Sequence, residues 1–172
     1  MGLRRQFAWM LAERFGYKAG SGEMAKTEIS IIINQPITKV FAFVADCQNL
    51  PRWTSRAYDV TITSVISASV GMTFLGVGRF LGQRIESPQE VIEFELNKKY
   101  AIKSVSGPLT FVLHYAFESA DSGTRIVFVG EVEPGRFFKA VQADLASAVK
   151  VLCETDLSRL KNLLEGQPIE TG

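Results

Sequence analysis

The sequence predicts an α+β domain in which a curved, seven-stranded antiparallel sheet wraps around a long C-terminal helix, with two short helices after the first strand. Residues 109–119 and 124–133 alternate apolar and polar side chains, which is typical of strands with one buried face. Residues 136–165 contain neither Pro nor Gly, and a helix of that length would measure about 45 Å. A helix this long with one apolar stripe needs a wide apolar surface, which a curved sheet provides.

The N-terminal half of this domain begins with a strand over 27–34, in which alternate isoleucines share one face. Pro36 suits the first position of a helix expected over 37–47. A second helical turn is expected over 48–53, where Pro51 introduces a kink. Together these segments form one end of the predicted sheet and its two short helices.

The remaining strands are separated by turn sequences. Turns rich in Gly, Asn and Pro delimit strands expected over 57–67, 72–83, 86–96 and 99–106. The last two strands flank the hairpin loop 120–123, in which Gly123 is expected to adopt a positive φ angle. The count of seven strands follows from these boundaries.

The chain is expected to hold one domain, over residues 24–165, followed by a tail over 166–172. Residues 1–23 end in the Gly- and Ser-containing break 19–22 and are expected to be an extension. Two alternatives stay open for this extension: a poorly ordered segment, or an amphipathic helix that docks on a membrane surface or a partner.

Composition excludes several classes of function. The 19 Lys and Arg nearly balance the 18 Asp and Glu without forming a basic stripe, so no nucleic-acid surface is expected. A single His and two separated Cys cannot assemble a zinc site, and no metal or cofactor is expected. No apolar run approaches the roughly 20 residues needed to cross a bilayer, so stable membrane insertion is not expected. Cys47 and Cys153 are expected to be buried, reduced thiols in the cytoplasm.

Several motifs carry a resemblance to a known family. Residues 34–46 read NQPITKVFAFVAD, and residues 49–53 read NLPRW. Further matches are 71–74, 107–108, 123–125 and 157–164. Over residues 27–165 the chain resembles the START-like helix-grip superfamily (SRPBCC), the polyketide cyclase/dehydrase and lipid-transport group. The resemblance implies the helix-grip fold. Because the superfamily includes binders, carriers, cyclases, dehydratases and subunits of assemblies, the function stays open.

Period-two alternation predicts which side chains face the helix and a cavity beneath it. In strand 109–119 the inward set contains Tyr115, whereas His114 points outward as a surface residue. In strand 124–133, Glu131 is expected to need water. In strand 86–96 the apolar residues of 92–96 alternate with glutamates and are expected to face inward. If this alternation continues back along the strand, Glu90 also faces inward. The expected ligand-binding side chains are Trp53, Phe74, Phe80, Tyr100, Phe111, Leu113, Tyr115, Phe128, Phe138, Val141 and Leu145.

Two further features leave alternatives open. Gly76 and Gly78 lie on the inner side of strand 72–83, either to let the sheet bend or to leave room for a ligand. Asp156 falls in the middle of the apolar stripe of the long helix, where a carboxylate needs a partner. It is either a polar anchor for a ligand, an exposed residue beyond the edge of the sheet, or part of an ion pair with Arg52.

The sequence therefore supports two functions of different classes. The first is a cytoplasmic carrier or binding protein for a hydrophobic small molecule, such as a lipid, isoprenoid, quinone or aromatic polyketide-like compound. The second is a polyketide cyclase or dehydratase in which Glu90 and Tyr115 are the candidate catalytic residues, with Tyr100 and Arg79 beside them. An interaction module with a completely filled interior is a third possibility, and the oligomeric state is left open.

Overall fold

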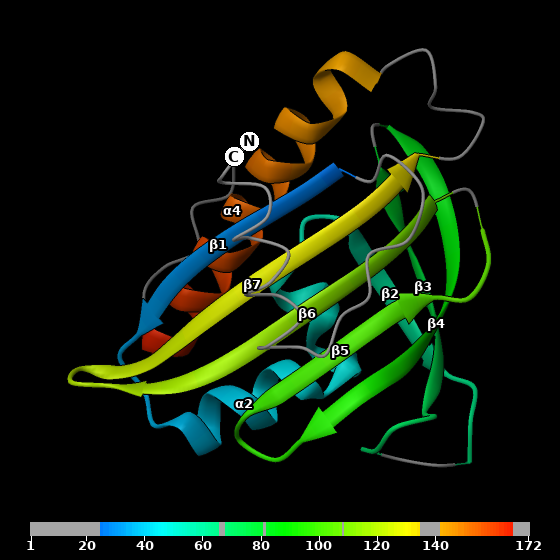
Figure 1. Ribbon diagram of the computed structural model, residues 1–172. Coiled ribbons are helices and arrows are strands. Elements are labelled where there is room, and N and C mark those ends of the chain that lie inside the picture. The colour runs from blue at the N-terminus through cyan, green and yellow to red at the C-terminus, as the bar shows by residue number, and fades with distance from the viewer. Residues whose placement is uncertain (1–24, 66–67, 81, 108, 135–141, 167–172) are drawn as a thin grey trace, which may run out of the picture.

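Seven antiparallel strands form one sheet in the order β1-β7-β6-β5-β4-β3-β2 (Figure 1). The computed structural model describes residues 25–65, 68–80, 82–107, 109–134 and 142–166. In chain order the elements are β1 (Ala25–Ile33), α2 (Ile37–Ala45), the 3₁₀ turn η1 (Cys47–Asn49), α3 (Leu50–Trp53), β2 (Ala57–Ile62), β3 (Thr73–Phe80), β4 (Gln83–Glu95), β5 (Lys99–Ser104), β6 (Leu109–Ala120), β7 (Gly123–Pro134) and α4 (Gln142–Glu165). The predicted helix-grip fold is confirmed.

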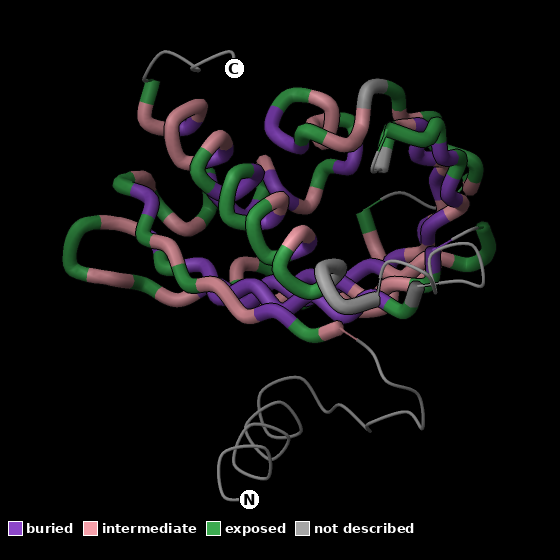
Figure 2. The backbone as a smooth tube through the Cα atoms, turned by 90° about the horizontal axis from the view of Figure 1, so that it is seen from above, coloured by how far each residue is buried: buried purple, intermediate pink, exposed green. Residues whose placement is uncertain are grey.

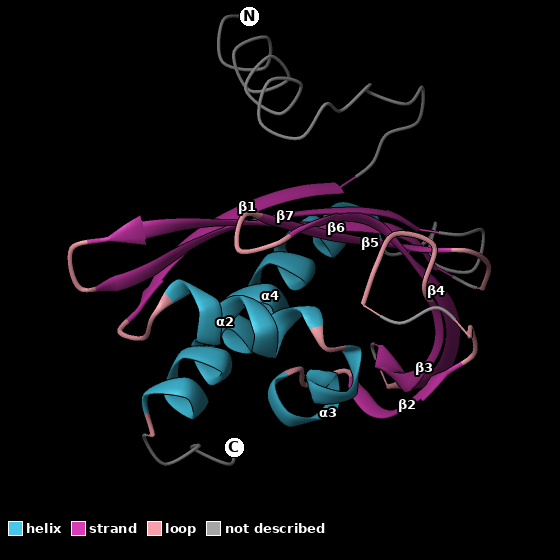
Figure 3. Ribbon diagram, turned by 90° about the horizontal axis from the view of Figure 1, so that it is seen from below, coloured by secondary structure: helices cyan, strands magenta, loops and turns pink. Residues whose placement is uncertain are grey.

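The described helices lie on one face of the sheet, and the β2–β3 end of the sheet curls toward them (Figures 2 and 3). Two register shifts accompany this curvature, one between Ala57 and Asp59 in β2 and one between Val91 and Glu93 in β4. An extra residue in one strand bends it and increases its local twist. The sheet therefore becomes a trough rather than a flat layer.

Capping and turn residues explain where α2, η1 and the β6–β7 turn begin or end. Pro36 precedes α2, as predicted, and α2 ends at Ala45 because Asp46 adopts an extended conformation. The Asp46 carboxylate then accepts a hydrogen bond from the backbone N–H of Gln48 at 3.0 Å and caps η1. Gly123 has a φ of +146°, and a Cβ there would overlap the carbonyl oxygen of Ile33. The predicted role of Gly123 in the β6–β7 turn is confirmed.

The apolar stripe of α4 packs into the trough beside β1 and α2. Within this stripe, Val149 and Leu160 are buried, and Leu152 and Leu163 are partly buried. Cys153 belongs to the same buried surface, and both cysteines are free and buried, as predicted. Residues 136–141 of the expected helix lie outside the described residues.

The outer face of the sheet differs from expectation at two positions. His114 points outward, but its residue is only 6% exposed, and Glu131 is 1% exposed. The Lys26 ammonium lies 2.6 Å from Glu131 Oε1. The prediction that both side chains reach water is wrong, because neighbouring strands and a paired lysine enclose residues in the middle of a wide sheet. Burial lowers the pKa of His114, although the nearby Glu131 carboxylate opposes the shift.

Candidate functional site

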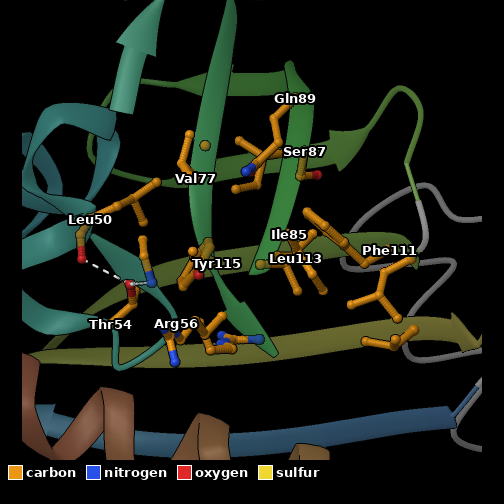
Figure 4. Close-up of a pocket in the computed structure, with 17 residues that line it drawn as sticks. Leu50, Thr54, Arg56, Val77, Ile85, Ser87, Gln89, Phe111, Leu113 and Tyr115 are labelled. Carbon is orange, nitrogen blue, oxygen red and sulfur yellow. Dashed lines mark hydrogen bonds between the residues drawn. The ribbon is translucent and has the colours of Figure 1, made fainter. Parts of the chain in front are cut away.

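A cavity of about 120 Å³ lies between the α3–β2 segment and the inner face of the strands (Figure 4). Apolar side chains make up most of its wall, and polar groups occupy a few positions. The lining residues are Leu50, Thr54, Arg56, Ala57, Gly76, Val77, Gly78, Arg79, Ile85, Ser87, Gln89, Ile102, Leu109, Phe111, Leu113, Tyr115 and Val132. The cavity is therefore a predominantly apolar site with a small number of fixed hydrogen-bonding groups, as is typical of small-molecule sites.

The described part of α4 whose side chains are placed, from Ala146 onward, contributes no lining residue. The expectation that this helix would form one wall of the cavity is wrong for these residues. Asp156 joins α4 to the segment after α3, and this segment rather than the described part of α4 covers the cavity. The cavity is thus formed by the sheet and the α3–β2 segment.

Three of the predicted ligand-binding residues line the cavity, namely Phe111, Leu113 and Tyr115. Their inward orientation follows from β6, which pairs with β7 over its full length without a register shift. Four others, Trp53, Phe74, Tyr100 and Phe128, belong to the hydrophobic core and are not among the lining residues. Phe138 and Val141 lie outside the described residues, as do the side chains of Phe80 and Leu145.

Three aromatic residues of the hydrophobic core pack against the Tyr115 ring. The ring centroid of Tyr115 lies 5.2 Å from that of Phe128, 6.1 Å from that of Tyr100 and 6.4 Å from that of Trp53. These spacings are typical of favourable aromatic packing. Tyr115 therefore lines the cavity while its ring is held in place by packing against these core residues.

Glu90 does not face the cavity, and its prediction as an inward acid–base group is wrong. It pairs in register with Lys103, and the Lys103 Nζ atom lies 3.0 Å from Glu90 Oε2 on the outer face. The extra residue Ile92 reverses the alternation within β4, so that Ser87 and Gln89 point inward instead. Sequence reasoning missed these two residues because it continued the parity of residues 92–96 across the bulge.

Asp156 is buried and bonded to the segment that follows α3. Its Oδ1 atom accepts hydrogen bonds from the backbone N–H and the hydroxyl of Ser55, both at 2.7 Å. Its Oδ2 atom accepts from Arg56 Nη2 at 3.0 Å and Arg56 Nε at 3.3 Å. An ion pair is confirmed, but the predicted partner is wrong. Arg52 instead stacks over the Phe43 ring, with 5.0 Å from its guanidinium carbon to the ring centroid.

The two glycines of β3 serve different purposes. A Cβ at Gly78 would overlap the backbone of Arg56, whose carbonyl oxygen accepts a hydrogen bond from the Arg79 N–H at 2.7 Å. Gly78 therefore permits the close passage of another backbone. A Cβ at Gly76 would lie 2.6 Å from Gln89 Nε2, which occupies the space that this glycine leaves open.

The tyrosine hydroxyls and the Cys153 thiol in and around the cavity favour their neutral forms. Burial raises the pKa of Tyr115, and the adjacent Arg56 guanidinium only partly opposes this shift. Burial likewise raises the pKa values of Tyr100 and Cys153. Among the described lining residues there is no Asp, Glu, His or Cys. Tyr115 can therefore donate a hydrogen bond to a ligand, but no described lining residue is suited to accept a proton from one near neutral pH.

Neither a metal centre nor a membrane span is found in the described part of the chain. Its His, Cys, Asp and Glu residues form no group of three or more that could hold a metal ion. None of its helices combines the length and the apolar character needed to cross a membrane.

Comparison with solved structures shows the same fold in proteins of low sequence identity. A protein from Thermus thermophilus is 16% identical, with a TM-score of 0.70 over 82% of this chain and 97% of that chain. The Zhui aromatase/cyclase from Streptomyces sp. R1128 is 12% identical, with a TM-score of 0.71 over 83% of this chain and 94% of that chain. A protein from Rhizobium leguminosarum is 21% identical, with a TM-score of 0.63 over 84% of this chain and 97% of that chain. No curated protein shows significant similarity.

The family itself is shown by sequence. The model of the polyketide cyclase/dehydrase and lipid transport family matches residues 24–165, which is most of the chain. The resemblance carried by residues 34–53 and the turn glycines is thereby confirmed. The chain belongs to the polyketide cyclase/dehydrase and lipid transport family, within the START-like helix-grip superfamily.

Proposed function

We propose that this protein binds a hydrophobic small molecule in the cavity beneath the α3–β2 segment and acts as a carrier or binding protein rather than as an enzyme. The observation that carries this proposal is the composition of the wall. Its described residues are mainly apolar, and none of them is a carboxylate, histidine or thiol. Affinity would come mainly from burial of apolar surface, at about 25 cal/mol per Å².

The size of the cavity supports a ligand with a compact ring system. An apolar cavity of roughly 150 Å³ is sufficient to bind benzene. The cavity of about 120 Å³ would thus enclose a ring-sized part of a ligand. The two free, buried thiols support action in a reducing compartment such as the cytoplasm.

Native mass spectrometry of the protein purified from its own host tests this proposal. The expected result is a retained apolar compound in the wild type. Its loss is expected in Val132→Phe, which enlarges an inward-facing lining residue of β7, but not in Val151→Phe, which alters an exposed residue of α4. Circular dichroism would establish that both variants fold. An empty protein that also binds neither naphthalene nor fatty acids in equilibrium dialysis would contradict the proposal.

A cyclase or dehydratase remains the second candidate because Tyr115, one of its two predicted catalytic residues, lines the cavity. Its hydroxyl could donate a hydrogen bond to an enolising carbonyl group, with the acid–base partner supplied by the substrate or by water. If this second function holds, Tyr115→Phe would abolish turnover of a poly-β-ketone while preserving its binding. Unchanged consumption of the poly-β-ketone by wild type and buffer alone would exclude it.

A further inference from the structure

The inner face of β3 and β4 contains a small polar recess in the otherwise apolar wall of the cavity. We call this recess the polar notch and define it by Gly76, Ser87 and Gln89. Gly76 and Ser87 lie directly opposite each other in the β3–β4 register, and Gln89 is the next inward residue of β4. All three line the cavity, and Figure 4 shows Ser87 and Gln89 side by side along the strand.

The side chains of the polar notch lack hydrogen-bond partners within the described protein. Ser87 is 8% exposed, and its buried Oγ atom makes no hydrogen bond to any described residue. Gln89 is 9% exposed, and nothing in the described residues binds its amide, which lies over Gly76. Thr54, another polar residue of the wall, differs because its hydroxyl donates to the carbonyl oxygen of Leu50 at 2.9 Å. Unpaired buried polar groups destabilise a fold, so a role outside folding is expected for them.

The charges around the cavity restrict what could pair with the polar notch. Arg56 is the half-buried cation of the wall, and Asp156 already neutralises it through two hydrogen bonds. Arg79, the other lining cation, is exposed to solvent. A carboxylate placed at the notch would lose its hydration without gaining an unpaired buried cation, which is unfavourable. A hydroxyl or carbonyl group avoids this penalty, because serine and glutamine both donate and accept hydrogen bonds.

We propose that the polar notch binds a neutral hydroxyl or carbonyl oxygen of a ring-containing apolar ligand. The cavity thereby selects oxygenated neutral molecules over pure hydrocarbons and over carboxylates such as fatty acids. The inference rests on the proposed function, because it names the class of ligand for the same cavity.

Equilibrium dialysis with three probes of one shape tests this assignment: naphthalene, 2-naphthol and 2-naphthoate. For the wild type, 2-naphthol is expected to bind about three- to tenfold more tightly than naphthalene. This ratio corresponds to the net free energy of one hydrogen bond. 2-Naphthoate is expected to bind more weakly than 2-naphthol. In Ser87→Ala and Gln89→Leu the preference for 2-naphthol should shrink, while naphthalene affinity should hold or improve.

Two further variants sharpen the test. Gly76→Ala should displace the Gln89 amide, since the new Cβ would lie 2.6 Å from Nε2, and should also reduce the preference. Ser30→Ala, an exposed serine on β1, should behave as wild type. Urea denaturation should show that Ser87→Ala is at least as stable as the wild type, because it removes an unpaired buried hydroxyl.

The outcomes separate the inference from the function on which it rests. If naphthalene binds but 2-naphthol has no advantage, or if its advantage survives in both Ser87→Ala and Gln89→Leu, the inference is wrong while the proposed function stands. Tightest binding of 2-naphthoate would also overturn the inference. If none of the three probes binds, the inference is contradicted, and the proposed function is contradicted as well when native mass spectrometry finds an empty protein that does not bind fatty acids.

Discussion

The Asp156 carboxylate on α4 lies 3.0 Å from Nη2 of Arg56, a residue 100 positions earlier in the chain. Asp156 is 1% exposed, and the same carboxylate also binds Ser55. This contact joins the C-terminal helix to the segment that covers the cavity. It therefore couples the stability of the fold to the shape of the binding site.

Replacement of Asp156 with Asn should destabilise the protein, because the half-buried Arg56 would lose its counter-charge and its carboxylate hydrogen-bond acceptor. Breaking a fully buried ion pair from one side typically costs about 3–5 kcal/mol, and the partial exposure of Arg56 should bring the loss to the lower end of this range. Urea denaturation would measure the change. The matched control is Glu154→Gln, which removes an exposed i,i+4 partner of Lys150 and should change stability by less than about 0.5 kcal/mol. Equal effects of the two variants would contradict this account of Asp156.

Gly78→Ala should destabilise the protein by about 2–3 kcal/mol, because the new Cβ would overlap the backbone of Arg56 and separate β2 from β3. Gly76→Ala is the matched comparison in the same strand. There the obstructing group is the end of the flexible Gln89 side chain, so a loss below about 1 kcal/mol is expected. Urea denaturation of both variants measures the difference. A similar loss of stability in each would show that strand propensity, rather than the close approach of the Arg56 backbone, requires a glycine at position 78.

His114 should make the stability of the protein depend on pH. Its pKa in the folded protein lies below its ordinary value of 6.5 because burial disfavours the charged ring. The unfolded chain therefore binds more protons at this residue, and the free energy of unfolding should rise with pH. The contribution is complete above pH 6.5 and is lost as the pH falls toward the depressed pKa.

Urea titrations between about pH 5 and pH 7 would measure this dependence. His114→Gln, which cannot titrate in this range, should flatten the curve relative to the wild type. A wild-type slope that persists unchanged in this variant would assign the pH dependence to other groups.

The two cysteines should resist modification in the native protein. Burial, reinforced by the nearby Asp46 carboxylate, raises the pKa of Cys47 to about 11, so only about one thiol in a thousand is ionised at pH 8. Burial also raises the pKa of Cys153. A colorimetric disulfide reagent should therefore react slowly with the folded protein and rapidly with both thiols in urea. Fast reaction of one thiol under native conditions would reveal local opening around that residue.

Glu90→Gln should leave naphthalene binding unchanged, because Glu90 faces away from the cavity and pairs with Lys103 at the surface. Its effect on stability should be below about 1 kcal/mol, as is usual for exposed ion pairs. Dialysis and urea denaturation test the two statements. A large loss of binding would mean that β4 adopts the other alternation in solution.

Sequence reasoning succeeded where patterns are local and uninterrupted. The inward orientation of Phe111, Leu113 and Tyr115 was predicted correctly, because β6 continues through these residues without a bulge. Helical periodicity likewise placed Asp156 on the buried stripe of α4. The partner of Asp156 could not be predicted, since nothing in the local sequence distinguishes Arg52 from Arg56 as the residue that packs on α4.

The errors in β4 have a different cause. One extra residue reverses every assignment on the far side of a bulge, so the misplacement of Glu90 and the omission of Ser87 and Gln89 are a single mistake. Burial of outward-facing side chains was also missed, because His114 and Glu131 are enclosed by residues from strands that are distant in sequence.

β4 has two chemically distinct faces before the bulge at Ile92, an inner face with Ser87 and Gln89 and an outer face with Glu86 and Glu90. Deletion of Ile92 would exchange these faces and present the carboxylates of Glu86 and Glu90 to the cavity. One residue of strand length, with no substitution, therefore separates a cavity with neutral polar groups from a cavity with carboxylates.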